Sequence, residues 1–556
     1  MCQTCSKITC VDSGIVGLLQ FTPFVVLRVR RSRMLQDLQD DKEGVNVGLS
    51  PAQYKSCNLR LNRALLGYTY AMSALETPNK ARALDETPFF GDVCLLGLGV
   101  TGRAVVDFFL RNQGFFNTLT IYPGAAEQKS LAYLQSLPES FIVHSNDEVV
   151  TGHFDIAVVS PGIPPHSELY QSAAEAATEI ISEPELAWRI APQKWIAITG
   201  TNGKTTVTEL IAVLLETAGK TAWAAGNIGI PCISVVAERD PNDWIVAELS
   251  SYQLHSTVHF SPDIAVLLNI TPDHVNWHGC HECYVEDKKR ILANLSFSTP
   301  AIIDVCQDET RAIADEITKE GKRVIHVGSA EGLHATPPRQ YQELAYVEPT
   351  TRTLVLESER GVFRLLHCDE LRIKGPHNAA NALAAAAAVF EVGATIDELN
   401  AGLASFFPLP HRFEPCGEIG GVSFINDSKA TNIDASIKAL SSFADDALAG
   451  SIVALFGGVD KGTDLDELVD ACMVPCRDAI CYGEAGKRFQ AALGARFPAH
   501  YVKTFDEAFD TAFELAHKGE TILLSPACAS FDEFDSFEAR GEQFKKKIAM
   551  LRGEQS

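Results

Sequence analysis

The sequence lacks an apolar run of the roughly 20 residues that a membrane-spanning helix needs. The longest candidate, residues 14–29, is interrupted by Gln20, Thr22, Pro23 and Arg28. It also lacks the basic start and small-residue cleavage site of a secretory signal. We therefore expect a cytoplasmic protein that does not associate with membranes.

Basic residues are scarce, with 47 Lys and Arg against 71 Asp and Glu, which gives a formal net charge of -24. Proteins that bind nucleic acid carry basic stripes against the phosphate backbone, and no such stripe is visible here. We expect no nucleic-acid partner. An anionic ligand would need cations gathered locally in its site.

A disulfide framework is also missing. The 15 cysteines are scattered, mostly alone inside apolar runs, which favours a reducing compartment and small core residues. Cys2-x-x-Cys5 has no second pair at ligand spacing, which disfavours a metal site there.

Residues 1–85 show no sustained alternation of strand-like and helix-like segments, and no function can be assigned to them. Two interpretations stay open. The segment is either a disordered extension, or the result of a start placed too far upstream, with Met72 as the alternative start.

From Asp92 onward, short apolar runs, glycine turns and helix-like segments alternate, which predicts an α/β fold with parallel sheets. A chain of 556 residues exceeds one hydrophobic core, and composition shifts near 181–192 and 407–411 suggest domains at 86–183, 184–408 and 409–556. We expect Rossmann-like first and last domains around a central phosphate-loop domain. Strands are predicted at 93–96, 156–159, 195–199, 244–248, 264–268, 452–456 and 521–524.

The most informative motif follows the predicted strand 195–199. It comprises Gly200, Thr201, Asn202, Gly203, Lys204, Thr205 and Thr206, and a helix over 207–218 is predicted after it. Glycine backbone N–H groups and a helix start can cradle phosphates, Lys204 can reach between the β- and γ-phosphates, and the Thr205 hydroxyl can bind Mg²⁺. Ile198 stands where the usual first glycine would be, so the alternative is a plain loop, which the flanking strand and helix disfavour.

Two further strand ends carry polar groups. Glu248 ends the strand 244–248, where it could hold Mg²⁺; without the phosphate loop, a solvated carboxylate would be the better interpretation. His274 follows the strand 264–268 and could bind metal or phosphate. His274, His278, Cys280, His281 and Cys283 together suggest zinc, but they crowd one loop without paired spacing, so polar loop residues are favoured.

Later segments offer a base and a small-anion site. Asn378 and Asn381 open an alanine-rich helix over 379–388 and could read a base or ribose, although Asn378 could equally be a helix cap. Lysines and hydroxyls gather after predicted strands in the last domain, which suits a small dianion. They lie in Asp427-Ser-Lys429-Ala-Thr431-Asn432, in Asp460-Lys461, and between Ser525 and Phe537, with Ser530 among them.

The first domain carries Gly97-x-Gly99-x-x-Gly102 after a strand, which alone would suggest NAD. No acidic residue ends the second strand, where Tyr122-Pro123-Gly124 stands instead. A dehydrogenase is therefore disfavoured.

In this order, these segments resemble the Mur ligase family over roughly residues 90 to 550. The phosphate loop, Glu248-Leu-Ser-Ser-Tyr-Gln and Asn269-x-Thr-Pro-Asp-His274 are shared broadly by the family. Asp427-Ser-Lys-Ala-Thr-Asn432 and Ser525-Pro-Ala-Cys-Ala-Ser530 look like its D-glutamate-adding branch.

The resemblance implies an ATP-dependent ligase that joins D-glutamate to UDP-N-acetylmuramoyl-L-alanine through an acyl phosphate in peptidoglycan precursor synthesis. It implies two Mg²⁺ ions, a CO₂-derived carbamate on Lys288, and a monomer. The roles implied at matching positions are as follows: phosphate and metal binding at Lys204, Thr205, Glu248 and His274; nucleotide binding at Asn378, Asn381, Arg412 and Asp427; the uridine-linked substrate at Val100, Thr101, Ser160, Gly162 and Asn227; the reaction centre at Lys429; and D-glutamate at Thr431, Lys461, Ser530 and Phe537.

Two alternatives stay open. Another ligase of the family could add a different amino acid or act on folate, and a non-catalytic ATP-binding module would belong to another class. Lys204, Glu248, His274, Lys288 and Lys461 are all present, which disfavours the second. The replacement at Tyr122-Pro123-Gly124 puts the expected uracil contacts in doubt.

Overall fold

The computed structural model describes residues 10–11, 14–15, 17–21, 25–29, 88–124, 133, 137–138, 140–144, 149–329, 343–443, 450–460, 462 and 464–553. The chain forms two compact units, Met1–Asp85 and Glu86–Ser556. Within the first unit, β1 (Cys10–Val11) pairs antiparallel with β2 (Gly14–Ile15), and β3 (Gly17–Phe21) with β4 (Val25–Val29). The other residues of 1–85, including Cys2, Cys5 and Met72, lie outside the described residues.

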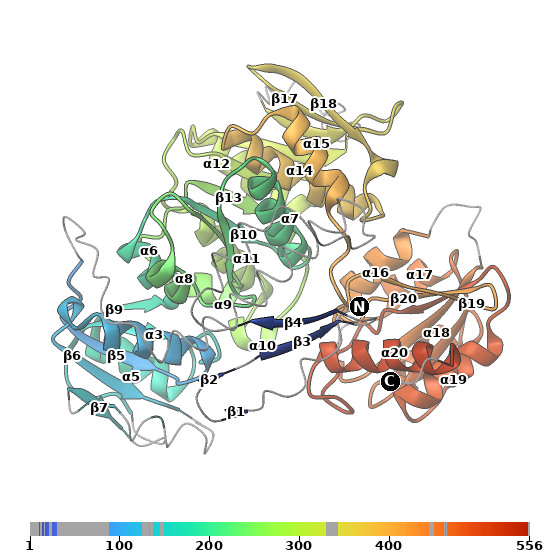
Figure 1. Cartoon of the computed structure of the whole chain (residues 1–556), viewed down its shortest axis with the longest axis horizontal. Coiled ribbons are helices and arrows are strands. Elements are labelled where there is room, and N and C mark those ends of the chain that lie inside the picture. The colour runs from blue at the N-terminus through green and yellow to red at the C-terminus, as the bar shows by residue number, and fades with distance from the viewer. Residues whose placement is uncertain are drawn as a thin grey trace. The chain divides into compact units, whose positions relative to one another are not determined.

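The second unit contains three α/β domains, each built on its own sheet (Figure 1). The first domain has a parallel five-stranded sheet in the order β7-β6-β5-β8-β9. Its elements are β5 (Asp92–Leu96), α3 (Val100–Arg111), η1 (Gln113–Phe115), β6 (Thr118–Tyr122), β7 (Phe141–Val143), β8 (Phe154–Val159), α5 (Glu168–Ala176) and β9 (Ala177–Ser182).

The central domain begins with the connecting helix α6 (Glu183–Ile190) and has a nine-stranded sheet in the order β11-β12-β10-β13-β14-β15-β16-β17-β18. Its strands are β10 (Trp195–Thr199), β11 (Ala222–Gly226), β12 (Trp244–Glu248), β13 (Ile264–Leu267), β14 (Ala301–Asp304), β15 (Val324–Ser329), β16 (Leu344–Val347), β17 (Thr353–Ser358) and β18 (Gly361–His367). Its helices are α7 (Lys204–Thr217), α8 (Cys232–Glu238), α9 (Ser251–His255), α10 (Val275–His278), α11 (His281–Lys289), η2 (Arg290–Leu292), α12 (Asp308–Lys319), η3 (Cys368–Glu370), α14 (Pro376–Glu391) and α15 (Ile396–Ser405).

The C-terminal domain has a six-stranded sheet in the order β19-β20-β24-β21-β22-β23, in which only the first pair is antiparallel. Its strands are β19 (Glu414–Ile419), β20 (Val422–Asn426), β21 (Ile452–Gly457), β22 (Cys476–Tyr482), β23 (Ala499–Tyr501) and β24 (Thr521–Leu524). Its helices are α16 (Ile433–Ser441), α17 (Asp466–Cys472), α18 (Gly486–Leu493), α19 (Phe505–Leu515) and α20 (Phe537–Leu551). The predicted α/β class is confirmed.

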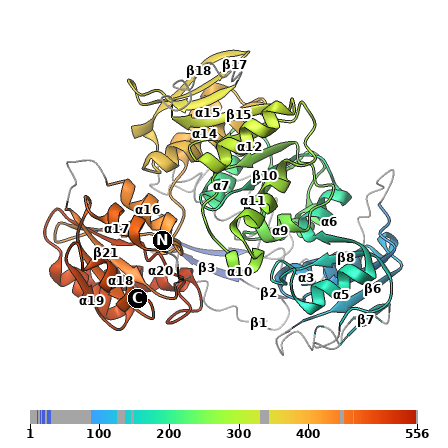
Figure 2. The ribbon, with the colours of Figure 1, turned by 180° about the vertical axis from the view of Figure 1, so that it is seen from behind.

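The central sheet is buried on both faces, as its near-continuous apolar strands require. Because side chains alternate along a strand, Ile196 and Ile198 pack into the cluster formed with α7, α14 and α15, whereas Trp195 and Ala197 pack into the opposite cluster. Figure 2 shows the second face, with α9 and α11 in front of the sheet. Because β10, β12 and β13 run parallel, their carboxyl ends lie at one edge of the sheet, where the loops gather.

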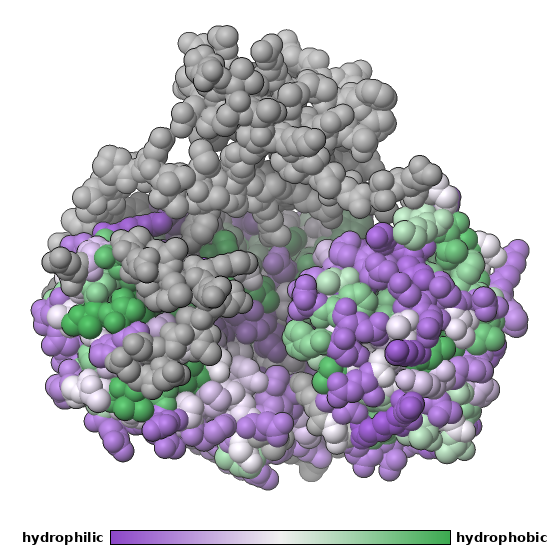
Figure 3. Space-filling model, turned by 90° about the horizontal axis from the view of Figure 1, so that it is seen from below, coloured by the Kyte–Doolittle hydropathy of each residue, from purple (hydrophilic) through white to green (hydrophobic). Residues whose placement is uncertain are grey.

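The surface is mixed. In Figure 3, hydrophilic residues separate smaller hydrophobic patches on one face of the molecule. No described helix is both long and apolar enough to cross a membrane.

The start of α6 buries an acidic side chain where the first and central domains join. Glu183 is 1% exposed, and its Oε1 accepts a hydrogen bond from the backbone N–H of Ile233 in α8. Its Oε2 has no hydrogen-bond partner among the described residues. Burial raises the pKa of Glu183 from 4.5 to about 7, against the lowering effect of the Ile233 hydrogen bond.

We predict that this carboxyl makes stability depend on pH. The folded protein keeps the Glu183 proton up to about pH 7, whereas the unfolded chain releases it near pH 4.5. Unfolding therefore releases a proton between these values, and stability falls as the pH rises, by up to about 3 kcal/mol.

Urea unfolding at pH 5 and pH 7.5 tests this prediction. Glu183→Gln should flatten the pH dependence, whereas Glu238→Gln, which alters an exposed ion pair with Arg111, should leave it unchanged. An equal loss of stability in wild type and Glu183→Gln would contradict the assignment.

Candidate active site

The phosphate loop joins the end of β10 to α7, which begins three residues earlier than the sequence predicts, at Lys204. Gly203 has a φ of 83°, and a Cβ there would lie 2.7 Å from the side-chain oxygen of Asn381. Glycine is therefore required for this close approach. The Lys204 Nζ donates to the carbonyls of Gly200 and Thr201, both at 2.9 Å, so the ammonium group folds back over its own loop.

Glu248 organises the loop from the neighbouring strand. It is 2% exposed, and its Oε2 accepts from the Thr205 hydroxyl at 2.7 Å. Its Oε1 accepts from the Asn227 amide at 2.8 Å. The carboxylate thus links the phosphate loop to the loop after β11.

Lys288 lies beneath the phosphate loop. Its side chain is buried, and Nζ donates to the Gly200 carbonyl at 2.7 Å and to the Thr199 hydroxyl at 3.5 Å. Burial, with the nearby Lys204 charge, holds the pKa of Lys288 well below its usual range, although Asp273 and Glu248 oppose the shift. Burial therefore favours the neutral amine over the ammonium form.

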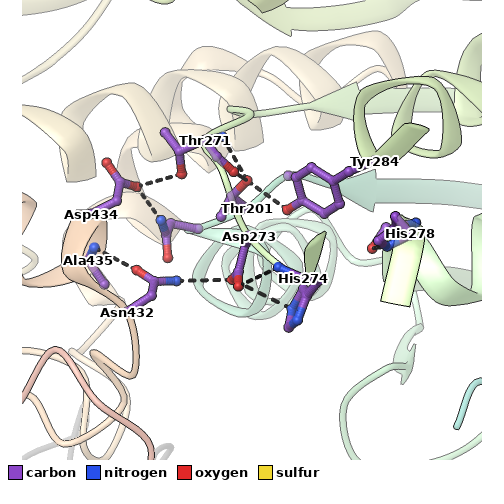
Figure 4. Close-up of polar contacts among 12 residues, drawn as sticks. Thr201, Thr271, Asp273, His274, His278, Tyr284, Asn432, Asp434 and Ala435 are labelled. Atoms are coloured by element: carbon purple, nitrogen blue, oxygen red, sulfur yellow. Dashed lines mark hydrogen bonds and ion pairs between the residues drawn. The ribbon is translucent and has the colours of Figure 1, made fainter. Parts of the chain in front are cut away.

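The segment from His274 to Lys288 packs against the same loop. His274 has a φ of 54°, in the left-handed region that non-glycine residues seldom adopt. The Tyr284 hydroxyl lies 2.8 Å from the Thr201 hydroxyl, and Figure 4 shows the ring directed toward Thr201. His278 Nδ1 lies 2.8 Å from Asp287, so the cluster that suggested zinc contains a histidine–carboxylate pair.

Among the described residues, no group of three His, Cys, Asp or Glu side chains could hold a metal by itself. The remaining cysteines of that cluster, Cys280 and Cys283, form a disulfide. The sequence analysis did not predict this bond, although the Cys-x-x-Cys spacing was its signal.

Cations reach the phosphate loop from the C-terminal domain. Arg412 donates to the Thr205 hydroxyl. Burial, together with the Arg412 charge, lowers the pKa of Lys429 to about 8, although Glu248 opposes the shift. Burial raises the pKa of Asp427 to about 7, against hydrogen bonds from Ser525 and from the Phe413 N–H.

Asp434, in the first turn of α16, contacts the central domain. Its Oδ2 accepts from the Asn202 amide and from the Thr271 hydroxyl at 3.2 Å, and it pairs with Lys438 at 2.8 Å. Asn432 donates to Asp273 at 3.4 Å while capping α16 at the N–H of Ala435 (Figure 4). Asp434 could not be predicted as a site residue, because nothing in the local sequence pairs it with a loop 232 residues away.

A cavity of about 540 Å³ lies between these elements. Many of the predicted site residues line it: Thr201, Asn202, Gly203, Lys204, Thr205, Thr206, Asn227, Glu248, His274, Asn378, Asn381, Arg412, Asp427, Lys429 and Thr431. Gly200 and Lys288 lie just behind the lining, joined by their hydrogen bond. The structure therefore brings these residues together from two domains.

Of the residues predicted to bind a uridine-linked substrate, Asn227 lines this cavity, whereas Val100, Thr101, Ser160 and Gly162 do not. Val100 is 76% exposed and stands with Thr101 at the start of α3, and the Ser160 hydroxyl donates to the Gly97 carbonyl at 3.3 Å. Gly162 is exposed in the next loop. The ring of Tyr122, which stands where a polar residue was expected, is buried and stacks on His144 at 4.3 Å.

The predicted amino-acid pocket is only partly described. Lys429 Nζ lies 4.0 Å from the centre of the Phe537 ring, and Ser530 is buried. Lys461 lies outside the described residues. Arg540, which the sequence analysis did not single out, is fully buried and donates to the Ser428 hydroxyl at 3.0 Å and to the carbonyls of Ser428 and Cys528 at 2.9 and 3.0 Å.

We predict that Asp434→Ala loosens the contact between the two domains. A hydrogen bond to a charged group contributes roughly 1.5–3 kcal/mol, so amide exchange at 200–204 and 432–436 should rise by at least about tenfold. Hydrogen-exchange mass spectrometry measures this change.

Asp466→Ala is the matched control for Asp434→Ala. Asp466 also lies in the first turn of a helix, α17, but is exposed. The Asp466→Ala substitution should leave amide exchange at 200–204 unchanged. Unchanged exchange at 200–204 in Asp434→Ala would show that the contact contributes nothing.

Three family models match consecutive parts of the chain. They are the Mur ligase MurD-like N-terminal domain at 91–182, the Mur ligase middle domain at 198–389, and the Mur ligase glutamate ligase domain at 411–528. Together they cover each of the three sheets.

Curated relatives and solved structures agree with these matches. The chain is 36% identical to the UDP-N-acetylmuramoylalanine--D-glutamate ligase of Alkaliphilus metalliredigens, over 83% of this chain and 98% of that protein. It is 32% identical to the protein of the same name from Natranaerobius thermophilus, over 84% and 99%.

The fold resembles that of the Thermotoga maritima MurF ligase in complex with ADP, with a TM-score of 0.52 and 15% identity over 84% of this chain and 96% of that one. It also resembles Thermotoga maritima UDP-N-acetylmuramate-alanine ligase, with a TM-score of 0.51 and 16% identity over 83% and 99%. At such identities these two likenesses bear on the fold alone. From the family models and the curated relatives it follows that the chain belongs to the Mur ligase family.

Proposed function

We propose that this protein is an ATP-dependent ligase that joins D-glutamate to UDP-N-acetylmuramoyl-L-alanine, with ADP and phosphate as the other products. The observation that carries the proposal is the cavity in which Lys204 and Glu248 of the central domain face Arg412 and Lys429 of the C-terminal domain. The curated relatives bear the name of this activity and match over 83% and 84% of this chain. The proposed substrates place the enzyme in the cytoplasm, and a monomer remains our expectation.

The cavity suits a nucleoside triphosphate. Backbone N–H groups at the start of α7 and the Lys204 ammonium would bind phosphates. Asn378 and Asn381 lie at the cavity wall on the first turns of α14, where they would contact the base or ribose, and Asp427 would accept from ribose hydroxyls. Arg412 would add a positive charge at the phosphates from the C-terminal domain.

Mg²⁺ fits the oxygen groups at the phosphate loop. Thr205 and Glu248 already lie in hydrogen-bond contact, and His274 lines the same cavity. Mg²⁺ commonly binds through one or two protein groups together with substrate phosphates, so a larger protein cage is not needed. When bound, Mg²⁺ would neutralise phosphate charge, and Glu248 would hold the Thr205 hydroxyl in place.

Lys288 fits the proposed carbamate. A neutral amine is the form that adds to CO₂, and burial favours that form. The carbamate would place a negative charge beside the phosphate loop, where Nζ now donates to the Gly200 carbonyl and to the Thr199 hydroxyl. The carbamate would supply an additional oxygen ligand for a second Mg²⁺.

Acyl transfer needs two anions to approach each other. The muramoyl-alanine carboxylate attacks the γ-phosphorus and releases ADP, forming an acyl phosphate. The neutral D-glutamate amine then attacks the acyl carbon, loses a proton and displaces phosphate. Lys204 and Lys429 would offset the repulsion from opposite walls of the cavity. Because its pKa is lowered to about 8, Lys429 would still be mostly protonated at pH 7.

The amino acid would bind in the C-terminal domain. Thr431 lines the cavity beside Lys429, and Phe537 packs against that ammonium group. Ser530 and Lys461 complete the proposed set. Arg540 would keep the loops after β20 and β24 in register, because one guanidinium bonds both.

The uridine-linked substrate would lie along the first domain and reach the cavity through Asn227. Val100 and Thr101 offer N–H groups at the start of α3, and Ser160 and Gly162 form the facing loop. The buried Tyr122 leaves no polar side chain at the end of β6, so uracil contacts would come from elsewhere in this domain.

We predict that the purified protein releases phosphate from ATP only when both UDP-N-acetylmuramoyl-L-alanine and D-glutamate are present. An acyl phosphate forms on the first substrate and turns over only with the second. A coupled phosphate assay measures this, with Lys204→Ala as an inactive control for contaminating ATPases. Release with L-lysine or diaminopimelate, but not with D-glutamate, would refute the proposed specificity.

We also predict that Lys288→Ala lowers kcat by about a hundredfold or more, the range seen when one preorganised group at a reaction centre is lost. Added acetate or formate should restore part of the activity by occupying the place of the carbamate. Lys289→Ala is the control on the same helix, since Lys289 pairs with Glu316 instead. Full activity in Lys288→Ala would rule out the carbamate.

A further inference from the structure

Cys280 and Cys283 have no role in the reaction proposed above. They form a disulfide with a Cα–Cα distance of 5.2 Å at the start of α11. Cys280 is also the N-cap of that helix, and its Sγ accepts from the N–H of Cys283 at 3.1 Å. The disulfide therefore closes the first turn of α11. The Cys280 sulfur also accepts from one of the N–H groups that the start of a helix would otherwise leave unpaired.

The helix behind this disulfide supports the phosphate loop. Cys280, Tyr284 and Lys288 are spaced four residues apart, so they follow one stripe of α11. Tyr284 contacts the Thr201 hydroxyl at 2.8 Å, and Lys288 donates to the Gly200 carbonyl at 2.7 Å. Movement of the first turn would thus reach the loop through Tyr284.

The segment before the disulfide is tied to the same helix. His278 lies two residues ahead of Cys280, with Nδ1 2.8 Å from Asp287 and Nε2 3.0 Å from the Ser251 hydroxyl. Asp287 also contacts His255 at 2.9 Å. Asp287 and these histidines hold the later part of α11, whereas the first turn is held by the buried Tyr284 ring and by the two cysteines.

The pair is accessible to exchange. Cys283 is exposed and Cys280 is half-buried. A Cys-x-x-Cys pair at a helix N-terminus is an arrangement in which the thiolate is stabilised by the helix dipole and disulfide exchange is fast. Neither cysteine is buried in the core, and no group of possible metal ligands is found among the described residues, so neither packing nor metal binding accounts for this pair.

We propose that Cys280 and Cys283 form a reversible redox clasp that sets how firmly α11 supports the phosphate loop. A small-molecule disulfide closes it: the Cys283 thiolate attacks one sulfur and releases one thiolate. The Cys280 thiolate then attacks Cys283 and releases the second thiolate. The two cysteines lose two electrons, which reduce the small disulfide, and their protons pass to solvent or to the released thiolates.

Opening the clasp weakens the first turn. Reduction breaks the covalent tie that holds the Cys280 sulfur beside the N–H of Cys283, so Cys280 caps α11 less often and the turn carrying Tyr284 frays more often. We expect nucleotide affinity to fall by roughly fivefold on reduction, the size of effect that losing one helix cap produces. Reduction and oxidation would then adjust activity without touching a reacting group.

The first test follows the clasp itself and does not depend on the proposed reaction. The full chain is equilibrated in mixtures of reduced and oxidised glutathione, thiols are trapped by alkylation, and the peptide holding 280 and 283 is weighed by mass spectrometry. The proposal requires a two-electron transition between both cysteines alkylated and neither alkylated. It also requires faster amide exchange at 281–285 in the reduced form. Failure of the disulfide to form at any glutathione ratio would overturn it.

The second test separates the covalent bond from the cap. Cys280→Ser with Cys283→Ser keeps a good cap without sulfur, and should bind ADP as tightly as the oxidised protein, whatever the redox conditions. Cys280→Ala with Cys283→Ala removes both, and should bind like the reduced protein or more weakly. Cys416→Ser, in β19 and not part of the cavity lining, should keep the wild-type redox response.

Calorimetry with ADP gives these affinities, and phosphate release gives the matching change in KM for ATP if the proposed function holds. A redox response that survives in the double serine variant would overturn the proposal, as would equal ADP affinity in oxidised and reduced wild type. If the ligase assay shows no activity, the ADP affinities and the thiol trapping still decide the matter. The two proposals can therefore fail separately.

Discussion

The parallel pairing of β10 with β12 on one side and β13 on the other is the constraint on which the candidate site depends. Ile198 pairs with Glu248, and Thr199 with Leu267, so three strands end together. The phosphate loop, the Glu248 carboxylate and the loop leading to His274 must then emerge at one edge. A shift of β12 by one residue would turn Glu248 to the other face and remove it from Thr205.

Burial makes the electrostatics of this edge unusual. An acidic chain places Lys429 and Arg412 in partly or fully buried positions, where burial lowers the pKa of each. Holding such cations without an anion is unfavourable, because desolvation opposes the charged form. A polyanionic ligand would remove that penalty. The cations that destabilise the unliganded protein therefore favour the binding of a triphosphate.

The fold was largely predictable from the sequence, because strands such as 195–199 and 244–248 are short apolar runs whose pattern is local. The phosphate loop and Glu248 were predictable for the same reason, each following its own strand. Contacts between distant segments were not. Asp434 meets Asn202 across 232 residues, and Arg540 meets Ser428 across 112, so no local period reveals either pair. The sequence shows Tyr122 at the end of its strand, but its burial against His144 could be seen only in the folded domain.

Arg540 shows how a buried charge can serve a neighbouring site without entering it. Its described hydrogen bonds go to a hydroxyl and to carbonyls, among them those of Gly457 and Ala529 at 3.4 Å, and none goes to a carboxylate. The carbonyl dipoles satisfy its N–H groups but do not cancel its charge. The loop after β24 also carries Asp532 and Glu533, so the role of Arg540 is to fix the two loops in place. A ligand bound beside these loops would therefore meet groups that are already held in position, without contacting Arg540 itself.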